Sequence, residues 1–228
     1  MKLEVLFEDD FLVAIHKPAG LLVHRTKLAK DATEFALQIL HDQINHKVFP
    51  THRLDRKTSG VLLFAKDEET NRIMQTQFMD REVGKSYKAI VRGWTDDKGT
   101  IDYALTNESG AEQEAVTHFE TIKRSEMDLP NGKFATARFS LVELNPETGR
   151  MHQLRKHLAH IFHPIIGDRP HGCNKQNKLF KEHFSMIEMM LHAEKLWFKH
   201  PKTGEDILIQ SSIRGEFKRM LEELNFDE

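Results

Sequence analysis

The sequence has little of what builds covalent, metal-bound or membrane-embedded structure. It has one cysteine, Cys173, so a disulfide within the chain is impossible and a metal site made of several cysteines is excluded. Such cysteine usage favours a reducing compartment, and we predict a cytoplasmic protein. No apolar run approaches the roughly 20 residues that a helix needs to cross a bilayer. The acidic segment 1–10 does not resemble a signal peptide, so we expect no membrane partner.

Linkers and repeats are also lacking. No stretch is rich in Gly, Ser or Pro, and no internal repeat or low-complexity segment interrupts the chain. The 228 residues are 39% hydrophobic and 30% charged, which suits a globular protein with a substantial buried core. We therefore predict a single domain over residues 1–228. The sequence is silent on oligomeric state, and a monomer is the simplest expectation.

The net charge is small, −2, and by itself argues weakly against a nucleic acid as partner. The distribution of charge says something different. From Thr148 to Lys178 there are six Lys or Arg residues, five histidines and a single acid, Asp168. Polyanions respond to local fields, so this basic stretch can bind RNA. A solvated surface is the alternative interpretation.

The pattern of apolar residues predicts an α+β fold on a mostly antiparallel sheet. Strands are expected at 3–7, 11–15, 21–24, 61–65, 85–93, 115–123, 134–144, 191–198 and 206–210. Helices are expected at 32–45, after Asp67, at 149–161 and from 213 onwards. Asp31 suggests a capping box, and 130–132 a hairpin turn. The polar segment 96–114 is expected to form a hairpin or an excursion, and both this segment and 125–133 are either specificity insertions or plain loops.

The segment 52–60 carries the most specific chemical pattern. One carboxylate, Asp55, stands among cations whose charge favours its anionic form. These cations are Arg53, Arg56 and Lys57. The apolar run 61–65 has the length of a buried strand, and Thr58-Ser59-Gly60 supplies a flexible turn before it. Such a loop presents one carboxylate as a nucleophile, general base or cation stabiliser. An ordinary surface ion pair is the alternative.

A second informative segment, 148–157, begins one of the predicted helices. Several strong hydrogen-bond donors lie close to its N-terminus, where anions are favoured. They are Arg150, His152, Gln153 and Arg155. From the residues alone, an exposed basic helix is an equal alternative.

Taken together, these segments resemble the RluA-type pseudouridine synthases. Residues 52–60 read HRLDRKTSG against the family signature HRLDxxTSG, and residues 149–157 read GRMHQLRKH against GRxHQLRxH. Residues 85–93, KSYKAIVRG, resemble the motif KxYxAxVxG. Further motifs at Lys17-Pro18, His163-Pro164 and Leu191-His192 follow in family order, so the resemblance covers residues 3–210.

The resemblance implies the pseudouridine synthase fold and an enzyme that isomerises uridine in RNA without a metal or a redox cofactor. It makes Asp55 the catalytic residue, Arg155 its ion-pair partner and Tyr87 the ring that stacks on the target uracil. Arg53 matches the residue that enters the space left by the flipped base. The RNA-binding positions that we predict besides Arg53 are His52, Thr58, Arg150, His152, Gln153, Lys156, Arg169 and Lys175.

The strings at 48–53, 115–118 and 163–172 look most like the branch that modifies uridine 65 in the T stem of tRNA. Many ribosomal relatives carry an extra N-terminal, S4-like RNA-binding domain. Here the first motif begins at Lys17, so we expect no such domain. Transfer RNA is therefore the expected partner, and ribosomal RNA is the alternative target.

Two other interpretations compete with an isomerase. Four histidines lie close together in sequence and could suggest zinc: His152, His157, His160 and His163. However, no HExxH string accompanies them, and His163-Pro164 is better explained as a helix end. A non-catalytic RNA-binding module is the other possibility. Such a module would not need a carboxylate, an orienting Arg and a Tyr in one place.

Overall fold

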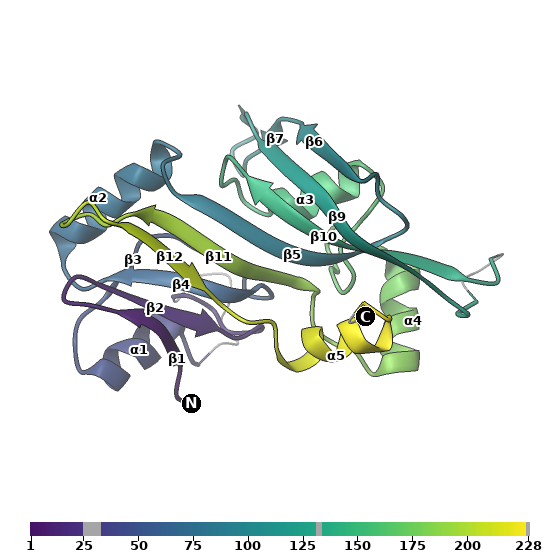
Figure 1. The fold of residues 1–228 in the computed structure, drawn as a ribbon, viewed down its shortest axis with the longest axis horizontal. Coiled ribbons are helices and arrows are strands. Elements are labelled where there is room, and N and C mark those ends of the chain that lie inside the picture. Colours follow the sequence, from purple (N-terminus) through teal and green to yellow (C-terminus); the bar gives the residue numbers. More distant parts are fainter. Residues whose placement is uncertain (25–32, 131–133, 227–228) are drawn as a thin grey trace. The chain divides into compact units, whose positions relative to one another are not determined.

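The computed structural model describes residues 1–24, 33–130 and 134–226. The chain divides into two compact units, each made from two separate stretches of sequence (Figure 1). Unit 1 comprises Met1–Lys85 and Ala193–Ser212, and unit 2 comprises Ser86–His192 and Ile213–Glu228. The single catalytic domain predicted from the sequence stays a prediction.

Unit 1 is a sheet with two helices. Its strands are β1 (Glu4–Glu8), β2 (Leu12–Lys17), β3 (Phe49–Pro50), β4 (Ser59–Ala65), β11 (Leu191–Lys199, in this unit from Ala193) and β12 (Asp206–Gln210). The pairs β1–β2, β2–β4, β3–β4 and β11–β12 are antiparallel, and β11 is also a neighbour of β4. Strands β2 and β4 are buried almost throughout, which explains their continuous apolar sequences. The helices are α1 (Ala36–Ile44) and α2 (Glu68–Met79).

Unit 2 is an antiparallel meander-like sheet with three helices. The strands β5 (Gly84–Arg92), β10 (Ala137–Pro146), β9 (Val116–Met127) and β6 (Lys98–Asp102) are neighbours in that order. The helices are α3 (Gln153–His160), α4 (Asn174–Phe184) and α5 (Gly215–Glu223). Phe139 and Phe180 meet edge to face, with ring centroids 5.1 Å apart, in the core of this unit.

The segment 96–114 forms regular structure in unit 2. Strand β6 pairs with β9, and the short strands β7 (Leu105–Thr106) and β8 (Glu112–Gln113) pair with each other. The Asn107 side chain closes this small hairpin by accepting the backbone N–H groups of Ser109 and Ala111. The segment is therefore not a plain loop, and a role in specificity stays a prediction.

Several predicted boundaries were wrong for local reasons. Residues 21–24 form no extended strand, because the carbonyl groups of Leu22 and Val23 accept the first N–H groups of α1 instead. Helix α3 begins at Gln153 rather than residue 149, after His152 adopts a left-handed φ of 56°. Helix α4 was not predicted at all. Asp31 and the turn at 131–132 lie outside the described residues.

Candidate active site

The Asp55 loop of unit 1 is a tight turn closed by a backbone hydrogen bond and held by the buried side chain of Lys17. The backbone N–H of Thr58 donates to the carbonyl oxygen of Asp55 at 3.1 Å, with the turn at Arg56 and Lys57. The Asp55 side chain is half-buried, whereas the cations Arg53, Arg56 and Lys57 are exposed. The loop thus presents its carboxylate at the edge of the rigid strand β4.

A buried ammonium group ties this loop to the turn after β2. Lys17 is fully buried, and its Nζ donates to the carbonyl oxygens of Pro18, Leu21 and Arg56 at 2.9–3.1 Å. Gly20 strengthens the same junction: its N–H donates to the Arg56 carbonyl, and its own carbonyl accepts from Arg56 Nε. The two motifs around Lys17 and Asp55 therefore form one clamped structure.

His52 supports the loop from inside. Its Nε2 accepts the backbone N–H of Leu63 at 3.1 Å, and its ring stacks on Phe78 with centroids 4.8 Å apart. Burial, and next the charge of Lys85, lower the pKa of His52 to about 3. The imidazole is thus neutral and engaged within unit 1, and its predicted RNA contact stays a prediction.

The turn predicted at Thr58-Ser59-Gly60 lies elsewhere. Ser59 and Gly60 already belong to β4, and Thr58 is buried. Gly60 has φ +112°, and a Cβ there would lie 2.1 Å from the carbonyl oxygen of Ala193 in β11. Glycine is required at this position because another backbone approaches closely, not because the chain must bend.

Arg155 of unit 2 makes a bidentate ion pair that the sequence analysis missed. Its Nε and Nη2 donate to Oδ2 and Oδ1 of Asp168, each at 2.8 Å. Both side chains are buried. The one signal in the sequence was that Asp168 is the only acid in the basic stretch 148–178. The predicted pair between Arg155 and Asp55 would join the two units, and it stays a prediction.

Gln153 is a connector within unit 2. Its Oε1 accepts from Thr148 Oγ1 and from the backbone N–H of Arg150, at 2.7 and 3.0 Å. Its Nε2 donates to the carbonyl oxygen of Val116 and to Thr117 Oγ1, each at 3.0 Å. These four bonds use the whole capacity of the amide. The structure therefore gives Gln153 a structural role, and its predicted RNA contact stays a prediction.

The other predicted residues of unit 2 lie around α3 and the loop after it. Tyr87, on β5 opposite Leu144, is half-buried against the core. The exposed cations are Arg169 and, on the first turn of α4, Lys175. Lys156 and Arg150 are less exposed; their side chains donate to the carbonyl oxygens of Thr106 (3.4 Å) and Glu114 (3.0 Å).

A pair of histidines lies beside these cations. His152 Nδ1 and His171 Nε2 are 3.0 Å apart. Burial lowers the pKa of His171; Asp168 opposes the shift, whereas Arg155, His152 and Lys156 add to it. Three positively charged or basic groups therefore act on one half-buried ring. This gathering gives a physical basis for anion binding on this side of unit 2.

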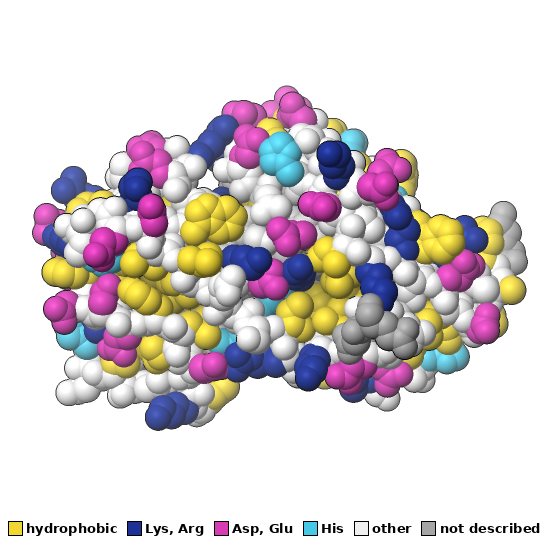
Figure 2. Space-filling view, in the orientation of Figure 1, with side chains coloured by type: hydrophobic (Ala, Val, Ile, Leu, Met, Phe, Trp, Pro, Cys, Tyr) yellow, Lys and Arg dark blue, Asp and Glu magenta, His cyan; other side chains and the backbone are white. Residues whose placement is uncertain are grey.

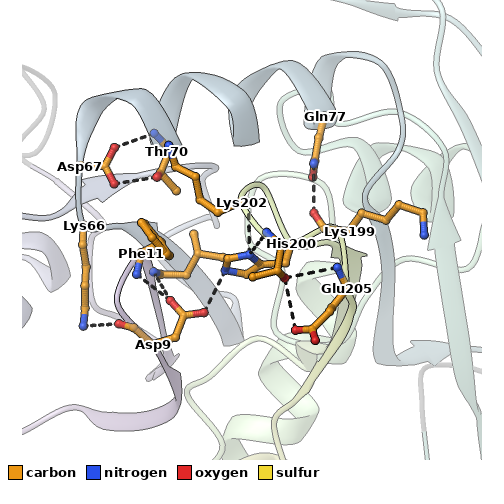
Figure 3. Close-up of polar contacts among 12 residues, drawn as sticks. Asp9, Phe11, Lys66, Asp67, Thr70, Gln77, Lys199, His200, Lys202 and Glu205 are labelled. Carbon is orange, nitrogen blue, oxygen red and sulfur yellow. Dashed lines mark hydrogen bonds and ion pairs between the residues drawn. The ribbon is translucent and has the colours of Figure 1, made fainter.

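The strongest other polar cluster is in unit 1 and is structural (Figure 3). His200 Nε2 lies 3.0 Å from Asp9 Oδ2, an arrangement that resembles a catalytic His–Asp pair. However, His200 Nδ1 accepts the backbone N–H groups of Lys202 and Thr203, and Asp9 Oδ1 accepts those of Phe11 and Leu12. The cluster joins two chain turns, and both ring nitrogens of His200 already have partners within it.

Charges of both signs intermingle on the face drawn in Figure 2, as expected from the small net charge. Among the described residues, no group of three or more His, Cys, Asp or Glu side chains could hold a metal ion. No helix in the described part of the chain is long and apolar enough to cross a membrane.

Comparison with known sequences identifies the class of protein. The model of the RNA pseudouridylate synthase family matches residues 11–160. A Vibrio parahaemolyticus protein named tRNA pseudouridine synthase C is 43% identical over 239 positions, covering 100% of this chain and 97% of the relative. The proteins of that name from Haemophilus ducreyi (47% identical; 99% and 97% covered) and Haemophilus influenzae (44%; 99% and 99%) are similarly close. The chain belongs to the RNA pseudouridylate synthase family and is an isomerase.

Solved structures agree on the fold. Human RNA Pseudouridylate Synthase Domain Containing 4 has a TM-score of 0.74 at 25% identity, covering 97% of this chain and 93% of that one. Human RNA Pseudouridylate Synthase Domain Containing 1 has a TM-score of 0.70 at 20% identity, with 98% and 95% covered. The predicted α+β pseudouridine synthase fold is confirmed.

Proposed function

We propose that this protein isomerises uridine to pseudouridine in tRNA, at position 65 in the T stem. The observation that carries the proposal is the Asp55 loop, which combines the family signature with a turn just before β4 that Lys17 holds through the Arg56 carbonyl. The choice of tRNA is supported by the names of relatives that cover this chain almost completely. A cytoplasmic, monomeric enzyme is part of the same proposal.

The reaction needs a carboxylate but no oxidant. The N1–C1′ bond breaks, the uracil turns, and C5 joins C1′ while the proton on C5 is replaced by one on N1. Positive charge develops at C1′ when the base departs, as in glycoside hydrolysis. The Asp55 carboxylate can trap C1′, add to the base or take the proton at C2′. All three roles require an anion within contact of the nucleoside.

The remaining residues bind and orient the nucleotide in this proposal. A base in a stem must first leave its stack, which costs a few kcal/mol. Arg53 fills the vacated space, and Tyr87 stacks on the uracil. Arg155 orients Asp55, as the family resemblance implies. The phosphate contacts come from Arg150, Lys156, Arg169 and Lys175.

Substitution of Asp55 tests the enzyme assignment. Asp55→Asn should bind tRNA with nearly unchanged affinity and form no measurable pseudouridine. Asp42→Asn is the matched control, because Asp42 is an exposed acid of unit 1 that accepts only a surface bond from Gln38. Full activity of purified Asp55→Asn protein would refute the role of the carboxylate.

The RNA target is tested in cells. Pseudouridine is mapped in total RNA from cells with and without the gene, and re-expression of Asp55→Asn serves as the inactive control. Loss of the modification at position 65 of tRNA supports the proposal. Loss confined to ribosomal RNA would replace tRNA by the alternative target.

A further inference from the structure

The backbone around Asp168 is fixed more tightly than an ion pair requires. Gly167 has φ +82°, and a Cβ there would lie 2.1 Å from the carbonyl oxygen of Glu188. A Cβ at Gly172 would lie 1.9 Å from the carbonyl oxygen of Asp168 itself. Neither position accepts a side chain without moving backbone. The loop that carries Asp168 is therefore confined on both sides.

Helix α4 adds a side-chain clamp to the same loop. Asn177 Oδ1 accepts the N–H of Gly167 at 2.9 Å, and Asn177 Nδ2 donates to the carbonyl oxygen of Asp168 at 2.7 Å. The N–H of His171 also donates to Asp168 Oδ1, at 3.3 Å. Contacts from two directions thus determine where the Asp168 carboxylate lies.

Stability alone does not explain this arrangement. The exposed fractions of the Arg155 and Asp168 side chains are 6% and 0%. Removing two charges from water costs several kcal/mol per ion, so a buried pair is often no more stabilising than apolar residues of similar size. Its distinctive property is direction: a guanidinium held through Nε and Nη2 cannot rotate.

We propose that Asp168 is a positioning residue for the isomerisation: it locks the Arg155 guanidinium in the orientation needed at the reacting nucleotide. The inference rests on the proposed function, in which Arg155 orients the catalytic carboxylate. Asp168 holds the Nε–Nη2 edge of the guanidinium and so fixes the direction in which the rest of the group points. Gly167, Gly172 and Asn177 of α4 together fix the backbone that carries Asp168. The position of α4 therefore determines where the Arg155 guanidinium lies.

Asp168→Glu is the discriminating variant. It keeps the buried negative charge, but its extra methylene moves the carboxylate and with it the guanidinium that the carboxylate binds. A displacement of this size can cost about 100-fold in rate. We expect Asp168→Glu to remain folded, with kcat lowered by about 10- to 100-fold and KM for tRNA changed less than about threefold. Asp97→Glu is the matched control, since Asp97 forms an exposed pair with Arg124 in the same unit. This control should retain wild-type kcat.

Asn177→Ala tests the contribution of α4, with the exposed Asn174→Ala on the same helix as control. We expect a lower kcat for Asn177→Ala alone. A folded Asp168→Glu protein with wild-type kcat would overturn the inference. So would a loss of activity that merely follows the folded fraction, measured by thermal melting of the same samples.

A second measurement separates this inference from the proposed function. The ¹⁵N resonance of Arg155 Nε should be sharp and slow to exchange in the wild-type protein, unchanged in Asp97→Glu and shifted or broadened in Asp168→Glu. If wild-type protein modifies no tRNA, the proposed function fails whatever this signal does. If the wild-type protein modifies tRNA but the Arg155 Nε resonance is the same in Asp168→Glu as in the wild type, only the positioning role fails.

Discussion

Lys17 Nζ lies 3.1 Å from the carbonyl oxygen of Arg56, the residue that follows the candidate catalytic acid. The ammonium group is fully buried and also donates to the carbonyl oxygens of Pro18 and Leu21. The buried ammonium group of Lys17 therefore has a structural role in unit 1. It holds the Asp55 turn against the turn after β2.

Replacing this ammonium should loosen the loop. Lys17→Met removes three hydrogen bonds made by a buried ammonium group, and we expect a loss of roughly 2–4 kcal/mol in the free energy of unfolding. Urea denaturation measures this loss. Lys47→Met is the control, because Lys47 makes only exposed contacts in the described structure, and its effect should be within about 0.5 kcal/mol. Equal effects of the two substitutions would contradict the role of Lys17.

The neutral His52 ring makes stability depend on pH. The unfolded chain protonates His52 below its ordinary pKa of 6.5, whereas the folded protein does so only near 3. This contribution is complete above pH 6.5 and is lost as the pH falls toward 3. The slope is at most about 1.4 kcal/mol per pH unit, the limit for one proton, and the partial exposure of the residue makes it smaller.

His52→Gln removes the titrating ring and keeps an acceptor for Leu63. The free energy of unfolding, measured with urea from pH 7.5 to 4, should therefore fall less steeply than in the wild type. His46→Gln, at an exposed histidine, should keep the wild-type slope. Parallel curves for His52→Gln and the wild type would refute the buried neutral ring.

Gly60 and Gly20 form a natural pair for testing close packing. Both have positive φ, but a Cβ at Gly20 meets nothing within 4 Å, whereas one at Gly60 meets the backbone of Ala193. Gly20→Ala should cost about 1–2 kcal/mol from backbone strain. Gly60→Ala should cost clearly more, with the overlap adding roughly 1–3 kcal/mol. Thermal melting measures the loss of stability in each variant. Equal losses would show that the backbone of β11 at Ala193 moves aside at little cost.

Substitution of Gln153 distinguishes a structural role of this residue from a contact with RNA. Gln153→Met removes four hydrogen bonds from unit 2, and we expect a loss of about 2–4 kcal/mol in the free energy of unfolding. The exposed Gln38→Met should change this free energy by less than about 0.5 kcal/mol. Unchanged stability of Gln153→Met together with weaker tRNA binding would contradict the structural role and support the predicted RNA contact.

Local pattern was enough to predict the loop, the strand β4 and the antiparallel sheet, because these depend on residues that are adjacent or alternate in sequence. The partner of Arg155 could not be predicted in this way. Asp168 reaches it through a loop shaped by two glycines and by α4. Helix α4 itself begins without a side-chain cap at Cys173, so its start carried no signal. His52 looked like a surface donor because nothing nearby in sequence shows that Phe78 covers it.

The alternation of the two units along the chain has a consequence for synthesis. The ribosome delivers the whole of 86–192 before 193–212, which contain β12 and most of β11. Until then one edge of β4 lacks its neighbour, and an open apolar edge invites wrong pairing. The sheet of unit 1 can therefore be completed only after most of unit 2 has been synthesised.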